Sequence, residues 1–385
     1  MTTAIYAFSG DPITYGHINI IERAIKVFDK VIVAIGENPD KTYTFNLAER
    51  KEMARKHFSN SAGMAHPHIK VMSFSNLLID FAYEQDASVI IKGVRNSADF
   101  DYESILHSVG QSQKIGIDTH ILFADPKLAH ISSSVVKAIA KHNGDISEYV
   151  PLHIKQTVEE RVCEQYIVGV TGEIGAGKSH ISKTIINSLN REVHNIELDH
   201  IAHDILERLE EPVYEQVRRE IDNAMSDGSL ACSILELDGF INRSVLGTIV
   251  FNDPKKLKKL NEIMAKPVMI RLRKEISGKK GIILINCALL AEADMLHICN
   301  NNVILIRVDK DTQKKRLIDR GLTEKQIETR LDCQCTYKRK KFMIEERIYF
   351  HQHGKLWEID NSNDMDKEAN KKFEDILFGE LDVWI

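Results

Sequence analysis

The chain has 385 residues, more than one hydrophobic core usually serves, so we expect two domains of ordinary size. Hydrophobic residues at 43% and charged residues at 28% exclude collagen-like, disordered and coiled-coil classes for the whole chain. Lys and Arg number 51 against 56 Asp and Glu, so no overall basic field exists to hold nucleic acid. No segment approaches the ~18 uninterrupted apolar residues of a membrane span. These features predict a cytoplasmic protein that binds neither nucleic acid nor membrane.

Short apolar runs alternate with amphipathic stretches through the first half. Their brevity and polar borders predict buried strands at residues 4–9, 31–35, 69–74, 88–91 and 119–124. Helices fit between them: Asn46 and Glu49 have the spacing of a capping box, and Ser132 begins a helix expected to reach residue 142. This alternation predicts an α/β fold with a doubly wound parallel sheet, whose ligands bind beyond the carboxyl ends of the strands.

The alternation pauses at residues 144–165, before a new apolar strand at 166–170. We therefore predict a first domain at 1–155, a linker at 156–165 and a second domain at 166–385. The second domain begins with a strand, a glycine-rich loop and a helix, and is expected to be largely helical from about residue 203 to 276. Its further predicted strands are 282–286, 303–308 and 356–359.

Residues 172–179, with the sequence GEIGAGKS, satisfy the P-loop pattern directly after a predicted strand. Glycines allow backbone N–H groups to close around a polyphosphate, and the N-terminus of the following helix favours anions. A lysine at the end of the loop reaches the β and γ oxygens, and the next hydroxyl ligates Mg²⁺. The pattern predicts a nucleotide site made of Gly172, Gly175, Ala176, Gly177, Lys178 and Ser179, with Ser179 as the Mg²⁺ ligand.

Two carboxylates, Glu197 and Asp199, follow about twenty residues later, at the end of a strand that we expect beside the P-loop strand. A carboxylate there can accept the proton of an attacking hydroxyl. The alternative is that Asp199 only caps the next helix. Farther on, Arg316 and Arg320 lie one helical turn apart and so share a face. That face either is solvated or presents guanidinium groups to a transferring phosphate.

These motifs, with residues 199–203, 237–243 and 250–251, resemble the dephospho-CoA kinase family over most of residues 166–365. The resemblance implies a P-loop NTPase-type kinase with a helical substrate domain and a lid. It implies that Asp199 is the general base for a ribose 3′-hydroxyl, Arg243 contacts the substrate, and Arg316 and Arg320 belong to the lid. Lys266 and Ala288 depart from the family pattern.

The first half carries a different set of polar residues. Gly16 and His17 open the helix after the first strand, Ser9 ends that strand, and Lys41 and Arg95 follow later strands. A lone histidine at a helix start is more often a cap or a packing residue. A cluster at one sheet edge instead suits in-line attack of a phosphate on the α-phosphorus of ATP, which needs charge stabilisation and positioning.

Residues 1–151 resemble the phosphopantetheine adenylyltransferase family, through residues 14–17, 93–103, 131–134, 144–145 and 150–151. The resemblance implies a Rossmann-like nucleotidyltransferase fold in which His17, Lys41 and Arg95 stabilise the transition state. The implied substrate-binding residues are Ser9, Lys41, Leu77, Leu78 and Lys92. The implied nucleotide-binding residues are Ser9, Gly16, His17, Gly93, Val94, Arg95, Glu103, Ile131, Ser132, Ser133 and Ser134.

The two families catalyse consecutive steps, so the sequence predicts a bifunctional enzyme for the last two steps of CoA biosynthesis. The expected partners are ATP as co-substrate, Mg²⁺, 4′-phosphopantetheine and dephospho-CoA, and the adenylyltransferase resemblance implies a homo-oligomer. Two alternatives stay open. The P-loop half could be a weak or regulatory nucleotide-binding module, which Lys266 and Ala288 favour. The chain could also be a fused nucleotidyltransferase and kinase of nicotinamide-nucleotide salvage, which would not predict residues 131–134 or 199–202.

Overall fold

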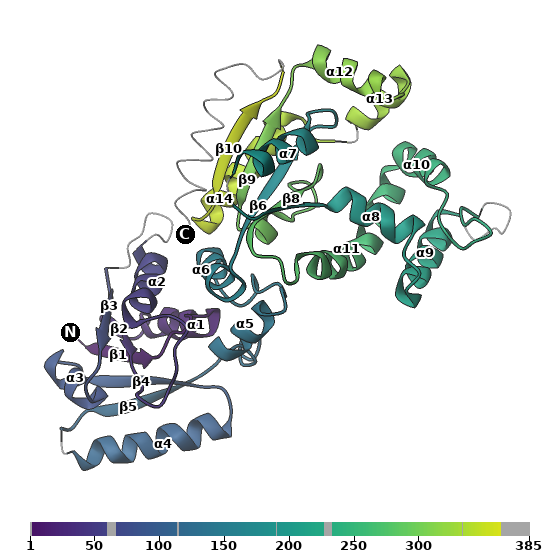
Figure 1. Cartoon of the computed structure of the whole chain (residues 1–385). Coiled ribbons are helices and arrows are strands. Elements are labelled where there is room, and N and C mark those ends of the chain that lie inside the picture. The colour runs from purple at the N-terminus through teal and green to yellow at the C-terminus, as the bar shows by residue number, and fades with distance from the viewer. Residues whose placement is uncertain are drawn as a thin grey trace. The chain divides into compact units, whose positions relative to one another are not determined.

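The computed structural model describes residues 2–59, 67–113, 115–189, 191–226, 233–332 and 334–362 (Figure 1). The chain divides into two compact units between Cys163 and Glu164. The described cysteines Cys163, Cys287, Cys299 and Cys335 form no disulfide, whereas Cys232 and Cys333 lie outside the described residues. Within the described ranges, no helix has both the length and the apolar character needed to cross a membrane.

The first unit is built on a five-stranded parallel sheet with the order β3-β2-β1-β4-β5. Its strands are β1 (Thr3–Phe8), β2 (Lys30–Gly36), β3 (Ile69–Phe74), β4 (Val89–Val94) and β5 (Asp118–Phe123). The five strands and their parallel arrangement are confirmed. The strand order reverses between β1 and β4, and such a switch point opens a crevice at the carboxyl edge of the sheet.

Helices cover both faces of this sheet, because its central strands are apolar on both sides. One core cluster joins the sheet to α1 (Tyr15–Ala24), α2 (Leu47–Ser59), α5 (Ser133–Ala140) and α6 (Leu152–Val158). A second cluster packs α3 (Leu78–Glu84) against the side chains of Ile5, Ile32 and Ile90. Helix α4 (Ser97–Ser112) follows β4.

Two helix starts follow the capping chemistry expected from the sequence. The backbone N–H of Asn46 donates to Glu49 Oε2 at 2.7 Å, and the Glu49 N–H donates to Asn46 Oδ1 at 2.9 Å, which is a reciprocal capping box. Ser132 Oγ accepts a hydrogen bond from the Val135 N–H at 3.2 Å and so caps α5.

The predicted linker at 156–165 differs from the structure. Most of it is helical, since α6 runs to Val158 and a π-helical turn follows at Glu159–Cys163. Ile154 and Val158 are fully buried in the first core cluster. The charged run at residues 159–161 suggested an exposed connection, but its apolar neighbours pack on the first unit and only Glu164 separates that turn from the next strand.

The second unit has its own five-stranded parallel sheet, with the order β10-β9-β6-β8-β7. Its strands are β6 (Gln165–Gly172), β7 (Val193–Glu197), β8 (Gly281–Asn286), β9 (Asn302–Arg307) and β10 (Lys355–Asp360). The strands predicted at 282–286, 303–308 and 356–359 are confirmed within one residue at each end. The expectation that β7 lies beside β6 is wrong, because β8 pairs with both and separates them. The 83 residues between β7 and β8 allow β8 to enter the sheet between β7 and the central strand β6.

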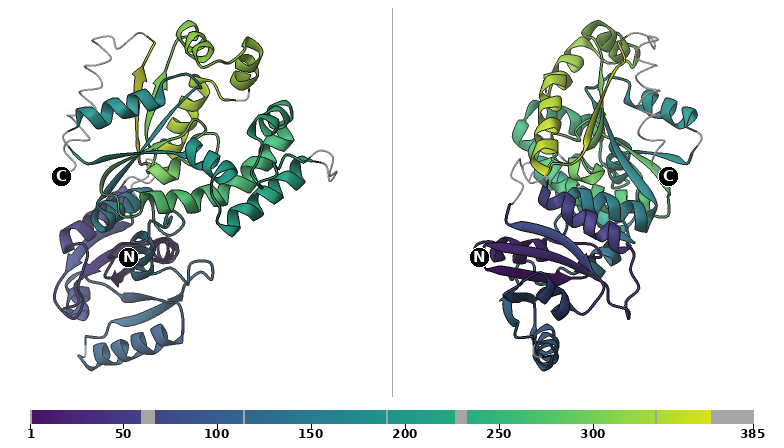
Figure 2. Two further views of the ribbon diagram at one scale, coloured as in Figure 1. Left: turned by 45° about the vertical axis from the view of Figure 1, so that its right-hand side comes forward. Right: turned by 90° about the vertical axis from the view of Figure 1, so that its left-hand side faces the viewer.

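Helix α7 (Lys178–Ser188) and helix α14 (Tyr337–His351) lie on opposite faces of this sheet (Figure 2). The largely helical stretch is confirmed as α8 (Leu198–Glu207), α9 (Pro212–Met225), α10 (Arg243–Asn252) and α11 (Pro254–Ile276), which share the core cluster of α14. A short 3-10 turn at Leu296–Cys299 precedes β9. The helices α12 (Lys310–Asp319) and α13 (Glu324–Asp332) follow β9.

The packing of α7 on the sheet predicts that removing a buried side chain of this helix destabilises the second unit. Ile185 is fully buried between α7 and the sheet, so Ile185→Ala should destabilise this unit by about 2–5 kcal/mol. Urea unfolding of the full chain measures the loss as an earlier transition. Ile318→Ala is the control, because this α12 side chain is 48% exposed and should change stability little. Equal shifts for both variants would contradict the predicted packing.

Candidate active sites

A cavity of about 810 Å³ opens at the carboxyl edge of the first sheet, where the strand order reverses. Its walls come from the residues that follow β1, β2, β4 and β5 and from the starts of α1 and α5. The sequence-predicted site residues that line it are Ser9, Gly16, His17, Lys41, Leu78, Lys92, Gly93, Arg95, Glu103, Ile131, Ser132, Ser133 and Ser134. Segments more than a hundred residues apart in the chain therefore share one cavity.

Two of the predicted residues lie elsewhere. Leu77 precedes α3 and is 61% exposed, and it does not line the cavity although its neighbour Leu78 does. Val94 is buried at the end of β4, and its side chain does not line the cavity. Val94 can therefore contribute only backbone atoms to this site.

His17 is held in one orientation and one tautomer. Its Nδ1 accepts the backbone N–H of Thr14 at 3.1 Å and lies 2.9 Å from Thr14 Oγ1, and its ring stacks on Phe8 with centroids 4.4 Å apart. Because a backbone N–H can only donate, Nδ1 carries no proton and the neutral ring bears its proton on Nε2. Burial and the nearby Arg95 guanidinium lower the pKa of His17 to about 4. The imidazole is therefore a neutral hydrogen-bond donor near pH 7.

The cationic side chains of the β4 end are paired with carboxylates of α4. Lys92 Nζ lies 2.8 Å from Glu103 Oε2, and Arg95 Nε lies 2.9 Å from Asp99 Oδ2. Arg95 Nη1 also donates to the Ile131 carbonyl at 3.5 Å, which links β4 to the segment before α5. The pairs keep positive charge at the cavity wall and compensate it with a neighbouring carboxylate.

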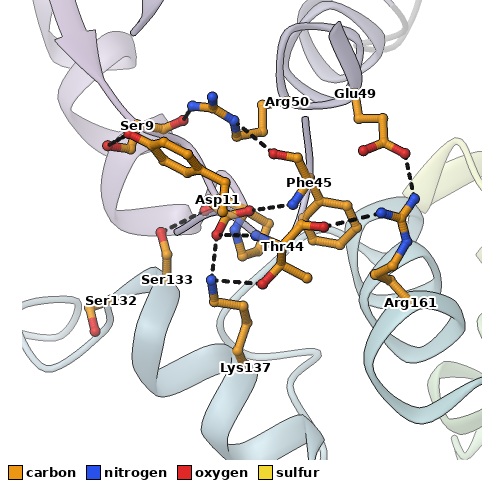
Figure 3. A network of polar contacts seen from close by, with 12 residues as sticks. Ser9, Asp11, Thr44, Phe45, Glu49, Arg50, Ser132, Ser133, Lys137 and Arg161 are labelled. Carbon is orange, nitrogen blue, oxygen red and sulfur yellow. Dashed lines mark hydrogen bonds and ion pairs between the residues drawn. The ribbon is translucent and has the colours of Figure 1, made fainter. Parts of the chain in front are cut away.

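Asp11 and Lys137, which line the cavity, belong to a polar network that includes Arg50 (Figure 3). The Asp11 carboxylate accepts the backbone N–H groups of Thr44 at 3.1 Å and Phe45 at 2.9 Å, and it pairs with the Lys137 ammonium. The fully buried Arg50 donates to the Ser9 carbonyl at 2.6 Å and the Gly36 carbonyl at 2.8 Å, at the ends of β1 and β2. This network fixes the relative positions of the loops that form the cavity.

The sequence did not single out these three residues for the site. Lys137 follows Ser133 by four positions, so both lie on one face of α5, and that spacing was the available signal. Asp11 follows the first strand by three residues, so it lies at the carboxyl edge of the sheet, where ligands bind. An aspartate at that position is equally consistent with a purely structural role. Arg50 extends from α2 to the ends of two strands, and no local sequence pattern predicts these contacts.

In the second unit, residues 172–179 connect β6 to α7 as a glycine-rich turn. Gly175 and Gly177 have positive φ angles of 79° and 91°, which side chains other than glycine rarely adopt. A Cβ atom on Gly177 would lie 2.2 Å from Asn361 Nδ2. Lys178 Nζ folds over the loop, 3.4 Å from the Gly172 carbonyl and 3.5 Å from that of Glu173. The loop is thus curved in the way that anion-binding backbone N–H groups require.

Side chains from distant parts of the unit hold this loop. Asn361 Nδ2 donates to the Ala176 carbonyl at 2.8 Å, and Arg316 Nη1 reaches the same carbonyl at 3.5 Å. The Ile174 N–H donates to Gln334 Oε1 at 3.0 Å, and Gln313 Nε2 donates to the Ile174 carbonyl at 2.7 Å. Arg316 therefore touches the P-loop from α12, and Arg320 ends that helix.

Asp199 lies in the first turn of α8, and its carboxylate is exposed. Burial lowers the pKa of Lys178, and the charge of Asp199 opposes that shift, so the two groups are close enough to interact. Burial, with the same carboxylate, raises the pKa of Cys287 to about 12, so this thiol stays protonated near pH 7. The structure thus brings the predicted base and the P-loop lysine into one electrostatic environment.

Arg243 is oriented by groups on α8. Its Nη1 lies 3.1 Å from Glu207 Oε2, and its Nη2 donates to His203 Nε2 at 2.8 Å. Because a guanidinium only donates, Nε2 of His203 accepts this hydrogen bond and carries no proton. Burial and the charge of Arg243 both lower the pKa of His203. Asp199, His203 and Glu207 recur every four residues and so share one face of the helix.

Comparison with known proteins agrees with the division into two units. Over 153 residues the chain is 44% identical to a phosphopantetheine adenylyltransferase of Nautilia profundicola, covering 40% of this chain and 96% of that protein. It is 41% identical over 162 residues to the enzyme of that name from Clostridium botulinum, covering 42% of this chain and 96% of that protein. The chain belongs to the phosphopantetheine adenylyltransferase family. Residues 9–139 also match the cytidylyltransferase-like family model.

The second unit carries a second family signature. Residues 166–348 match the dephospho-CoA kinase family model, which begins with β6 and extends into α14. The adenylyltransferase and kinase domains together indicate a bifunctional enzyme of the last two steps of CoA biosynthesis.

The low pKa of His17 predicts a pH-dependent stability. The pKa falls from 6.5 to about 4 on folding, so between these pH values the unfolded chain binds a proton that the folded protein excludes. Stability should decrease as the pH falls through this window, by about 2 kcal/mol at pH 5. Unfolding of the wild type and of His17→Gln at pH 7 and pH 5 isolates this contribution, because the other histidines are common to both. The same pH dependence in both proteins would contradict the neutral imidazole.

The P-loop geometry predicts a specific effect of Gly177→Ala. The added Cβ would displace Asn361 or the loop, and losing two backbone hydrogen bonds of about 1 kcal/mol each lowers nucleotide affinity about 30-fold. Titration calorimetry with a non-hydrolysable ATP analogue should detect two sites in the wild type, one of which binds about 30-fold more weakly in the variant. Gly278→Ala is the matched control, because Gly278 has a φ of 76° with nothing within 4 Å of an added Cβ. Equal binding by the two variants would refute the assigned P-loop role.

Proposed function

We propose that the first unit transfers the adenylyl group of ATP to 4′-phosphopantetheine and that the second unit phosphorylates the resulting dephospho-CoA. The observation that carries the proposal is the presence, in one chain, of two phosphate-directed sites with different chemistry. The first gathers a neutral histidine and four cationic side chains around a cavity, and the second has a P-loop with a nearby carboxylate.

In the first reaction, a phosphate oxygen of 4′-phosphopantetheine attacks the α-phosphorus of ATP, and pyrophosphate leaves. Negative charge grows on the oxygens of the α-phosphate and on the leaving group, so fixed donors lower the barrier. His17 Nε2–H is such a donor, and the Lys41 and Arg95 side chains supply positive charge. No proton has to move through His17, which suits an imidazole held neutral by burial.

Residues at the ends of β1 and β4 and at the starts of α3 and α5 are suited to bind the two substrates of the first unit. Ser9 and Lys92 are suited to the phosphate of phosphopantetheine, and Leu78 to its apolar arm. Lys92 is paired with Glu103 in the structure, so phosphate binding exchanges one anionic partner for another. The segment at residues 131–134, whose backbone begins α5, is suited to the triphosphate of ATP.

In the second reaction, Asp199 accepts the proton of the ribose 3′-hydroxyl as its oxygen attacks the γ-phosphorus, and ADP leaves. Lys178 and the arginines Arg316 and Arg320 offset the negative charge of the transferring phosphoryl group. Arg243, held by Glu207 and His203, is suited to an anionic group of the acceptor. The exposed position of Asp199 lets an acceptor reach it without rearrangement of the sheet.

A magnesium ion fits the oxygen donors of the second site. Mg²⁺ retains several waters and uses one or two protein oxygens together with substrate phosphates. The hydroxyl of Ser179, next to Lys178 in the first turn of α7, would be one such protein oxygen. When bound, the ion neutralises charge on the β and γ phosphates. Mg²⁺, the homo-oligomer and the cytoplasmic location expected from the sequence stay predictions.

The two family matches favour this pair of reactions over nicotinamide-nucleotide salvage, since the relatives of the first unit are adenylyltransferases of phosphopantetheine. A regulatory P-loop module has less support, because the carboxylate of Asp199 lies close enough to Lys178 of the P-loop to affect its pKa. Of the two departures from the family pattern, Lys266 is exposed on α11 next to the buried Pro267, and Ala288 is buried.

Product analysis by mass spectrometry tests both steps in one assay. With 4′-phosphopantetheine, ATP and Mg²⁺, the wild type should produce CoA. His17→Gln should slow dephospho-CoA formation by about 100-fold or more, because it removes a transition-state donor, yet still convert supplied dephospho-CoA. Asp199→Asn should accumulate dephospho-CoA. CoA formation by Asp199→Asn at the wild-type rate would refute the assigned base, and a wild type that stops at dephospho-CoA would support the regulatory alternative.

A further inference from the structure

The π-helical turn at Glu159–Cys163 contacts the loop between β2 and α2 through one side chain (Figure 3). Arg161 Nη1 donates to the Thr44 carbonyl at 3.1 Å, and Nη2 pairs with Glu49. The guanidinium carbon also lies 5.3 Å from the centroid of the Phe45 ring. A single arginine thus meets a carbonyl, a carboxylate and an aromatic face, a combination that a planar guanidinium can satisfy at once.

The same loop residues are held from the opposite side. The N–H groups of Thr44 and Phe45 donate to Asp11, and Lys137 Nζ lies 3.1 Å from Thr44 Oγ1. Thr44 is therefore fixed through its N–H, its carbonyl and its hydroxyl. The residues directly before it, from Lys41 to Tyr43, line the cavity.

Arg161 itself does not line the cavity, so it can act on the chemistry only through the loop. We propose that Arg161 is a positioning residue for adenylyl transfer, which holds the loop so that Lys41 meets the reacting phosphates. The proposal rests on the proposed function of the first unit. It assigns a role in the first reaction to a residue only three positions before the second unit begins.

The contact is suited to positioning rather than to stability. The Arg161 and Glu49 side chains are 47% and 32% exposed, and exposed ion pairs contribute little to folding. Removing the guanidinium should therefore leave the fold intact and release the loop on one side. A small displacement of Lys41 from the reacting phosphates should lower the rate of adenylyl transfer strongly, while the free energy of unfolding changes little.

The first test compares Arg161→Gln with Arg55→Gln in the full chain. Arg55 is a matched control, because it forms an exposed ion pair with Glu52 on α2 and contacts none of the loop residues. Arg161→Gln should lower kcat/KM for dephospho-CoA formation about 10-fold, whereas Arg55→Gln should change it less than about 2-fold. Both variants should phosphorylate supplied dephospho-CoA like the wild type. Equal rates for the two variants, or parallel losses in both reactions, would overturn the proposal.

A double-mutant cycle with Lys41→Ala decides whether the effect passes through Lys41. If Arg161 positions that lysine, Arg161→Gln should cost less than about 2-fold once Lys41 is absent. A full additional 10-fold loss would show that Arg161 acts by another route and would refute the proposal. A wild type that forms no dephospho-CoA would instead refute the proposed function, so the two failures are distinguishable.

Discussion

Both sites must concentrate positive charge where a phosphate will bind, yet remain stable before it arrives. An isolated charge that is withdrawn from water is costly, so each buried cationic group needs a partner before phosphate binds. Lys92 and Arg95 have carboxylates of α4, and Lys178 has main-chain carbonyls of its own loop. His17 avoids the cost by remaining neutral. The composition of each site follows from this one electrostatic constraint.

The partners also supply precision. Arg50 donates to the carbonyl of Ser9, directly after β1, and to that of Gly36 at the end of β2, and Asp11 accepts two N–H groups of the loop after β2. These side chains hold the cavity walls together through contacts with main-chain atoms. In the second unit, Asn361 and Gln313 do the same for the P-loop. Contacts to backbone atoms restrict a loop more directly than contacts between flexible side chains, and preorganised donors lower a barrier without a reorganisation cost.

The two units have the same sheet architecture, although under the proposed function each breaks a different phosphate bond of ATP. Each has a five-stranded parallel sheet whose carboxyl edge carries the polar groups, and each places a helix start at that edge. Under the proposed function, polar side chains of the first unit surround the α-phosphate of ATP, and the main chain of the P-loop in the second unit surrounds the β and γ phosphates. The product of the first reaction is the acceptor for the second, which gives a chemical reason for one chain to carry both.

The sequence by itself determined the strands, their parallel class and the two phosphate motifs, because these depend on local periodicity, glycine placement and capping residues. It also placed together most of the first-site residues, since the carboxyl ends of parallel strands meet at one edge. Tertiary structure decided what depends on long-range packing: the insertion of β8 between β6 and β7, the helical form of residues 156–163, and the burial of Val94. It alone brought Asp11, Arg50 and Arg161 to the loop before α2, because contacts between residues separated by up to 117 positions leave no periodic trace in the chain.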